Sequence, residues 1–285
     1  MLVISSISVL KDQIKKSRTG RVGLVPTMGA LHEGHLSLVR NAALKCSLVV
    51  VSIYVNPAQF NDREDLKNYP RSPEKDLDLL RKVLREGDIV FTPDDKEIYP
   101  AEDKRVFDFG NAGNVMEALH RPGHFNGVGQ IVSRLFDITG PDMAFFGQKD
   151  LQQVAVIKEL VRQCRYKVRI IVNPVIREAD GLAMSSRNIL LDAGDRKKAP
   201  LIYKTISGAA KMIPQSDIPE IRDYVISTIR EKTGFDVEYF EIADERNLVP
   251  VTSKKEMKKR RRYFGCIAIR AGKIRLIDNI EFPLP

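Results

Sequence analysis

The sequence predicts an α/β protein in which a doubly wound, Rossmann-like parallel sheet is followed by a smaller α+β domain. Over residues 1–177, short apolar runs alternate with stretches whose apolar residues recur at helical spacing, as in proteins built on a parallel sheet. After residue 177, two long helical stretches come first and three strands follow, which is typical of an α+β domain. We therefore expect a larger domain at residues 1–177 and a smaller C-terminal domain, partly a lid, at residues 178–285.

The composition allows a sizeable core and favours acidic partners. Of the 285 residues 43% are hydrophobic, and the net charge of +9 suits either a nucleic acid or small acidic substrates such as nucleotides and carboxylates. Cys46, Cys164 and Cys266 follow no disulfide or metal spacing, which predicts a cytoplasmic location. The first residues lack the pattern of a signal peptide, and no run approaches the ~20 apolar residues of a membrane helix, so we expect no membrane association.

Five short apolar runs predict the strands of the sheet. They occupy residues 21–25, 48–55, 88–91, 143–146 and 168–172. Helical patterns lie between them; the clearest boundaries are Ser72 with Pro73 at a helix start, and Gly87 and Gly140 at two helix ends. Because ligands of such sheets bind beyond the carboxyl ends of the strands, we expect the loops after residues 25, 55 and 146 to hold the site.

The second domain is predicted from the order of its elements. The two helical stretches cover residues 193–213 and 217–233, and the strands cover residues 235–243, 266–270 and 274–277. No internal repeat or low-complexity linker precedes them.

The stretch from Pro26 to Leu36 is the chemical centre of the sequence. It joins a buried strand to a helix start, and Gly29 and Gly34 allow a ligand to approach the backbone closely. His32 and His35 are spaced to share a face where the helix dipole is positive, which makes a site for phosphate oxygens. Two other interpretations stay open for these histidines, as surface residues of a helix or as zinc ligands, although no third ligand stands at a recognised spacing.

Two further segments in the first domain carry polar side chains. Gln59, in the loop Asn56–Phe60, offers an amide at the end of a strand that could hold a hydroxyl or carboxylate, although an ordinary polar loop explains it equally well. The segment Arg121–Val128 contains His124 and follows His120. A capped helix start explains this segment better than direct catalysis does.

Two more segments carry cations. Lys149, in Phe146–Asp150, is a movable charge for phosphate, and because a cation at a helix start opposes the dipole, its position favours function. Gln153 lies one helical turn further on. The loop Asp180–Asn188 contains two hydroxyls and a guanidinium after a glycine, and these groups can wrap a triphosphate. The alternative is that the loop only joins two domains. Its place between the domains makes it a mobile lid in our interpretation.

Five stretches together resemble the pantoate–β-alanine ligase (pantothenate synthetase) family, in the family's order and with its spacing. They are Val25–His35, Asn56–Phe60, Arg121–Phe125, Phe146–Asp150 and Asp180–Asn188, and a weaker likeness extends to Arg275–Asn279. The H-x-G-H element at His32–His35 also resembles the wider nucleotidyltransferase superfamily of class I aminoacyl-tRNA synthetases. Any one stretch would be weak evidence, whereas five in register are strong.

The resemblance implies a reaction in two steps. ATP and (R)-pantoate give pantoyl adenylate and pyrophosphate, with Mg²⁺, and the amine of β-alanine then attacks the adenylate to release pantothenate and AMP. The resemblance also implies a homodimer. The residues agree with this chemistry, because in-line attack on a phosphorus mainly requires positioning and charge stabilisation, and no serine or cysteine lies beside a general base by motif.

The resemblance further implies roles for individual residues. The expected catalytic residues are His35, as proton donor, His32, Lys149 and Arg187. Gln59 and Gln153 would bind pantoate, with Gln59 also on the β-alanine side. The expected ATP-binding residues are Met28, Gly29, Ala30, Leu31, His32, Glu33, Gly34, His35, Gly147, Gln148, Lys149, Asp150, Ile176, Met184, Ser185, Ser186 and Arg187.

The sequence does not decide which residues bind the metal ion or what the basic run does. Many family members carry paired acids after the turn Tyr69-Pro70-Arg71, but here the pair is Lys75 and Asp76, which puts a direct metal role in doubt. The run Lys254–Arg262 has the charge of a nucleic-acid-binding protein, but no aromatic platform accompanies it, so we expect a solvated face and no specific nucleic acid. Another H-x-G-H adenylyl- or cytidylyltransferase is a second alternative, against which the pair of glutamines argues.

Overall fold

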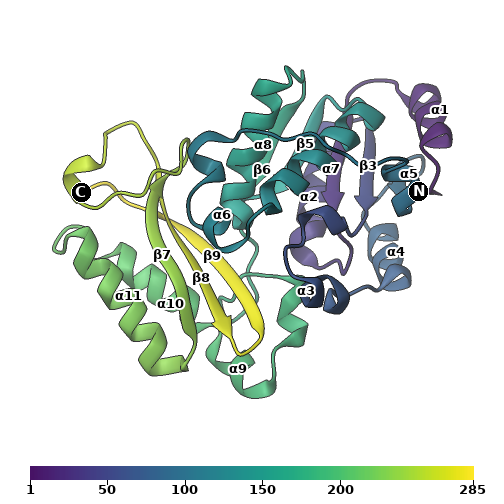
Figure 1. Cartoon of the computed structure of the whole chain (residues 1–285). Coiled ribbons are helices and arrows are strands. Elements are labelled where there is room, and N and C mark those ends of the chain that lie inside the picture. The colour runs from purple at the N-terminus through teal and green to yellow at the C-terminus, as the bar shows by residue number, and fades with distance from the viewer. The chain divides into compact units, whose positions relative to one another are not determined.

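The computed structural model describes residues 1–285, which form two compact units (Figure 1). The first unit contains Met1–Phe109, Arg121–Gln148 and Val156–Pro174. The second contains Gly110–His120, Lys149–Ala155 and Val175–Pro285. The second unit therefore combines the C-terminal part of the chain with two short segments that come earlier in the sequence.

The first unit is built on a six-stranded sheet in which every neighbouring pair is parallel. Its strands are β1 (Leu2–Ile4), β2 (Val22–Thr27), β3 (Leu48–Ile53), β4 (Ile89–Phe91), β5 (Met143–Gly147) and β6 (Arg169–Asn173). The order β1-β4-β3-β2-β5-β6 means that the chain runs outward from β2 through β3 to β4 and then resumes on the other side of β2. The predicted doubly wound sheet is confirmed, and its strand order reverses between β2 and β5, where such sheets bind ligands.

Helices surround this sheet. They are α1 (Ile7–Ser17), α2 (Glu33–Lys45), α3 (Arg63–Asn68), α4 (Pro73–Arg81), α5 (Asp95–Ile98), α7 (His124–Thr139) and α8 (Leu151–Gln163), whose first residues belong to the second unit. Val39 of α2 and Leu80 of α4 share one buried cluster with Val25, Val51 and Val90 of the strands. Helix α7 packs against β2 and α1. The strands are apolar because they are buried on both faces, and each helix is apolar only on the face that packs against the sheet, which explains the alternating pattern of the sequence.

Helix α4 is shorter than predicted. Pro73 begins it, but it ends at Arg81 rather than at Gly87. The chain continues in tighter turns, in which the Val83 amide donates to the Leu80 carbonyl, until Gly87 reverses it at a φ of +89°.

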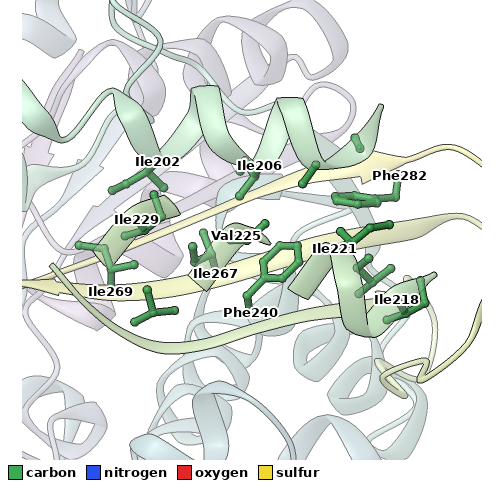
Figure 2. Close-up of a cluster of buried hydrophobic side chains, with 14 of the residues drawn as sticks. Ile202, Ile206, Ile218, Ile221, Val225, Ile229, Phe240, Ile267, Ile269 and Phe282 are labelled. Carbon is green, nitrogen blue, oxygen red and sulfur yellow. The ribbon is translucent and has the colours of Figure 1, made fainter. Parts of the chain in front are cut away.

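The second unit has a three-stranded antiparallel sheet of β7 (Asp236–Asp244), β8 (Tyr263–Ala271) and β9 (Ile274–Phe282). Its helices are α6 (Glu117–His120), α9 (Ala193–Lys198), α10 (Leu201–Ala210) and α11 (Ile218–Thr233). Helices α10 and α11 lie side by side against the sheet (Figure 1). Figure 2 shows the core between them, where Ile206, Val225 and Ile229 of the helices meet Phe240 and Ile267 of the strands. The predicted α+β architecture is confirmed.

The predicted helix over residues 193–213 is broken in two. Helix α9 ends at Lys198 and α10 begins at Leu201, with Pro200 between them. Because proline has no N–H and its ring displaces the preceding turn, it interrupts the helical hydrogen bonds here. No helix in the structure is both long and apolar enough to cross a membrane.

Candidate functional site

The turn between β2 and α2 is held in an unusual conformation by a buried carboxylate. Gly29 and Ala30 have φ values of +77° and +48°, and the second is unfavourable for a residue with a Cβ. Asp76 of α4 accepts hydrogen bonds from the Ala30 amide at 2.9 Å and from the Leu31 amide at 2.7 Å. Asp76 is only 1% exposed; burial raises its pKa, while the Leu31 and Ala30 amides act to lower it. Asp76 therefore fixes the turn that leads into the two histidines.

His32 and His35 lie together, as their spacing predicts. Their ring centroids are 4.1 Å apart. His32 is the N-cap of α2, where its Nδ1 accepts from the Gly34 amide at 3.1 Å, and Nδ1 of His35 accepts from the His32 amide at 3.3 Å. A neutral imidazole whose Nδ1 accepts a hydrogen bond carries its proton on Nε2. In the neutral form of each ring the proton is therefore on Nε2.

Several backbone amides of this turn donate to side chains of the protein. The amides of Ala30 and Leu31 donate to Asp76, and those of His32 and Gly34 donate to the imidazoles. Four backbone amides of the turn are therefore already paired within the protein.

Gln59 is positioned near Met28 in the first unit. It ends the short helical turn Pro57–Gln59 after β3, is buried, and donates from Nε2 to the Met28 sulfur at 2.8 Å. Met28 also lines a pocket of about 430 Å³, together with Gly29, Tyr54 and Asp76. Two residues assigned to different ligands by resemblance, Met28 and Gln59, are thus brought into contact.

The segment Arg121–Val128 holds Gln59 in place. His124 is buried and donates from Nδ1 to the Gln59 carbonyl at 2.7 Å, while Nη1 of Arg121 lies 3.2 Å from its Nε2. A Cβ on Gly127 would approach the Ala58 carbonyl oxygen to 2.2 Å, so only glycine permits this packing. His124 is therefore a positioning residue, a role that neither catalysis nor simple helix capping describes.

In the second unit, Lys149 is anchored to strand β9. It lies in the helical turn Gln148–Asp150 that follows β5, and its carbonyl accepts from Nδ2 of Asn279 at 2.9 Å. Its ammonium is 3.8 Å from the Asp150 carboxylate. Burial raises the pKa of the neighbouring Asp278, and the Arg177 guanidinium and then the Lys149 ammonium act to lower it.

The segment Met184–Arg187 follows a small hairpin of the second unit. Arg177 and Ala183 form an antiparallel bridge, and the Met184 amide donates to the Ile176 carbonyl at 3.0 Å. Ser185 then begins the helical turn Ser186–Leu190, with its Oγ accepting from the Arg187 amide at 3.3 Å. The segments around residues 149, 176 and 184–187 thus belong to one unit, as does Gln153 on α8.

The basic run is partly used inside the second unit. Lys254 donates to the Ile213 carbonyl at 3.0 Å, Arg261 pairs with Asp244 at 3.3 Å, and Arg262 pairs with Glu281 at 2.7 Å. Lys255, Lys258, Lys259 and Arg260 are exposed. Three of the cations therefore have partners within the second unit, and four others face solvent.

No group of three or more histidine, cysteine, aspartate or glutamate side chains is arranged to hold a metal ion. The carboxylate of Asp76, the acid that remains of the family's pair, is taken by two backbone amides. The zinc interpretation of His32 and His35 therefore has no third protein ligand.

The chain is similar to known proteins along nearly its whole length. The family model described as pantoate-beta-alanine ligase matches residues 2–281. The pantothenate synthetase of Porphyromonas gingivalis is 42% identical over 284 residues, which covers 99% of each chain. The crystal structure of pantothenate synthetase from Thermus thermophilus has a TM-score of 0.91 at 36% identity, covering 99% of this chain and 100% of that one. A pantoate-beta-alanine ligase from Francisella tularensis, complexed with beta-gamma ATP and beta-alanine, has a TM-score of 0.79 at 34% identity, covering 98% and 97%. The family model that matches residues 2–281 and the 42% identity over the whole length show that the chain belongs to the pantoate–β-alanine ligase family.

Proposed function

We propose that this chain condenses (R)-pantoate with β-alanine in an ATP-dependent reaction that passes through pantoyl adenylate and releases pyrophosphate and AMP. Family membership over residues 2–281 supports the reaction, and the related Francisella protein is complexed with beta-gamma ATP and beta-alanine. The single observation that carries the proposal is the turn in which His32 and His35, with ring centroids 4.1 Å apart, both accept a backbone amide on Nδ1.

In the first step a pantoate carboxylate oxygen attacks the α-phosphorus and pyrophosphate leaves. Charge grows on the departing oxygens, and preorganised donors stabilise it without reorganising. Nε2–H of His35 donates to a leaving phosphate oxygen, with His32 beside it. Lys149 and Arg187 supply positive charge, each from a backbone segment that is fixed by hydrogen bonds of the second unit.

Mg²⁺ enters this scheme with ATP, as part of the substrate. Magnesium is commonly bound through substrate phosphates and water, with few protein ligands. A chain without a preformed cluster of acidic and imidazole ligands suits this mode of binding.

In the second step the neutral amine of β-alanine attacks the acyl carbon, the bond from that carbon to the AMP oxygen breaks, and the nitrogen loses one proton to solvent as AMP leaves. Gln59 and Gln153 hold pantoate through amide hydrogen bonds. His124 holds the backbone carbonyl of Gln59, and contacts with Met28 and Asn56 orient its side-chain amide. The intermediate stays non-covalent in this scheme, because no serine or cysteine lies beside a general base by motif.

The proposal extends to a cytoplasmic homodimer. Three unpaired cysteines suit a reducing compartment. Sedimentation velocity should give about twice the chain mass of 32.2 kDa, and a monomer at micromolar concentration would contradict the dimer.

The experiment that tests the function is a screen of acids by exchange of labelled pyrophosphate into ATP. Pantoate should support exchange without β-alanine, whereas a branched acid of similar size without hydroxyl groups should not. His35→Ala is the negative control. Formation of a dinucleotide from ATP and a nucleoside monophosphate, without exchange on pantoate, would instead indicate another H-x-G-H transferase.

A further inference from the structure

Two adjacent residues of β9, Asp278 and Asn279, contact Lys149 and Arg177, and Arg177 belongs to the hairpin that precedes Met184–Arg187. Asp278 and Asn279 are both buried, at 4% and 3% exposure. Nδ2 of Asn279 donates to the Lys149 carbonyl at 2.9 Å. Lys149 lies 130 residues earlier in the chain, so only this fold brings the two together.

Asp278 makes the second connection. Its two carboxylate oxygens accept from Nη1 and Nη2 of Arg177 at 2.6 Å and 2.9 Å, a bidentate pair that fixes the guanidinium plane. The same guanidinium donates to the Gly181 carbonyl at 3.1 Å and lies over the ring of Tyr203, 3.7 Å from its centroid. The hairpin that leads into Met184–Arg187 is thereby tied to β9.

We infer that Asp278 and Asn279 are positioning residues that set Lys149 and the Met184–Arg187 segment in one fixed arrangement for the triphosphate. The inference rests on the proposed function, which gives both segments their phosphate-binding role. Neither residue needs to contact the substrate. Each acts on a backbone or side chain at a defined place, so that two cations from distant parts of the sequence reach the same anion in register.

A buried amide in a strand could also serve stability alone, and the two roles differ in what they predict. If Asn279 only stabilises the fold, replacing it lowers the melting temperature and reduces every activity in proportion to the fraction of folded protein. If Asn279 positions Lys149, replacing it slows adenylate formation in folded protein, and the effect depends on the presence of the Lys149 side chain. Non-additivity between the two sites measures this dependence directly.

The test compares Asn279→Leu, which keeps the branching at Cγ but removes the donor, with Tyr263→Phe. Tyr263 lies on β8 of the same sheet and accepts from the Lys258 amide at 2.9 Å, so it is a matched buried polar group away from Lys149. Pyrophosphate exchange with pantoate should slow about 10- to 10²-fold in Asn279→Leu and less than about twofold in Tyr263→Phe. Affinity for ATP should fall, while affinity for adenosine, which has no phosphate, should not change.

The decisive arm uses Lys149→Ala, which retains the backbone carbonyl that Asn279 binds. In that background Asn279→Leu should slow exchange by less than about twofold, because the group it positions is gone. An equal loss with and without Lys149, or a loss no larger than that of Tyr263→Phe, would overturn the inference. If Asn279→Leu does not fold, Asn279→Ser removes the same contact with a smaller polar group, and the same comparison holds. Wild-type protein without pantoate-dependent exchange would refute the proposed function instead.

Discussion

The carboxylate of Asp76 should be essential for the conformation of the β2–α2 turn. In Asp76→Ala, two buried amides, those of Ala30 and Leu31, lose their acceptors at once. An unsatisfied buried donor costs about 1–3 kcal/mol, so the free energy of unfolding should fall by about 2–6 kcal/mol. Asp76→Asn keeps one oxygen and turns an NH₂ toward the other amide, so about half of that loss is expected. Without its acceptor, Ala30 is free to leave its φ of +48°, and the histidines then lose their orientation.

Urea unfolding and pyrophosphate exchange on Asp76→Asn separate stability from function. The matched control is Asp88→Asn, because Asp88 is a buried acid of the same unit that accepts from the Val49 amide at 2.9 Å and pairs with Arg85. Both variants should lose comparable stability, but only Asp76→Asn should slow exchange in folded protein, by about 10- to 10²-fold. Equal exchange rates in the two variants would refute the argument that Asp76 acts through the turn.

Three further predictions concern charge. His35→Ala, Lys149→Ala and Arg187→Ala should each slow adenylate formation by about 10²–10³, because each removes one preorganised charged or donor group. Their circular dichroism spectra should change little. A near-normal rate in His35→Ala would contradict the catalytic role of His35. Hydrogen bonding from Arg105, reinforced by Arg134, lowers the pKa of Asp103 to about 2. Because this pKa lies below the unfolded value of ~3.9, the ionised carboxylate contributes up to about 2 kcal/mol above pH ~4, and this is lost as the pH falls toward 2. The difference in unfolding free energy between wild type and Asp103→Asn should shrink over that range, and a pH-independent difference would contradict it. Changing the exposed Lys255, Lys258 and Lys259 to Gln should leave turnover unchanged, with any nucleic-acid affinity near ~10⁻⁴–10⁻⁶ M and abolished by salt; tight, sequence-selective binding would show that the run has a partner.

The features that could be predicted from sequence are those with local causes. Runs such as residues 48–53 are buried on both faces and therefore apolar throughout, so they identified the strands. The spacing of His32 and His35 predicted that the rings lie together, because three residues make nearly one helical turn. The break at Pro200 was also visible locally, since proline has no amide for the helix, and the prediction of one long helix gave it too little weight.

The features that escaped prediction depend on contacts between distant residues. Asp76 looked like the remnant of an acid pair, and only the fold shows that its carboxylate holds amides 45 and 46 residues earlier. His124 looked like part of a helix cap, whereas it binds the Gln59 carbonyl 65 residues away. Nothing in the composition of residues 110–120 marks them as part of the second unit. There Glu117 is buried and forms a bidentate pair with Arg275 at 2.7 Å and 2.6 Å.

Transfer of an oxygen atom is the most direct test of the central claim that this chain activates pantoate as an acyl adenylate. Pantoate labelled with oxygen-18 in its carboxylate is incubated with ATP, Mg²⁺, β-alanine and the protein, and the nucleotide product is analysed by mass spectrometry. Attack of the carboxylate on the α-phosphorus predicts AMP that carries one labelled oxygen, formed in step with pantothenate. Unlabelled AMP, or ADP with the label in inorganic phosphate, would show that activation follows another route and would contradict the adenylate mechanism.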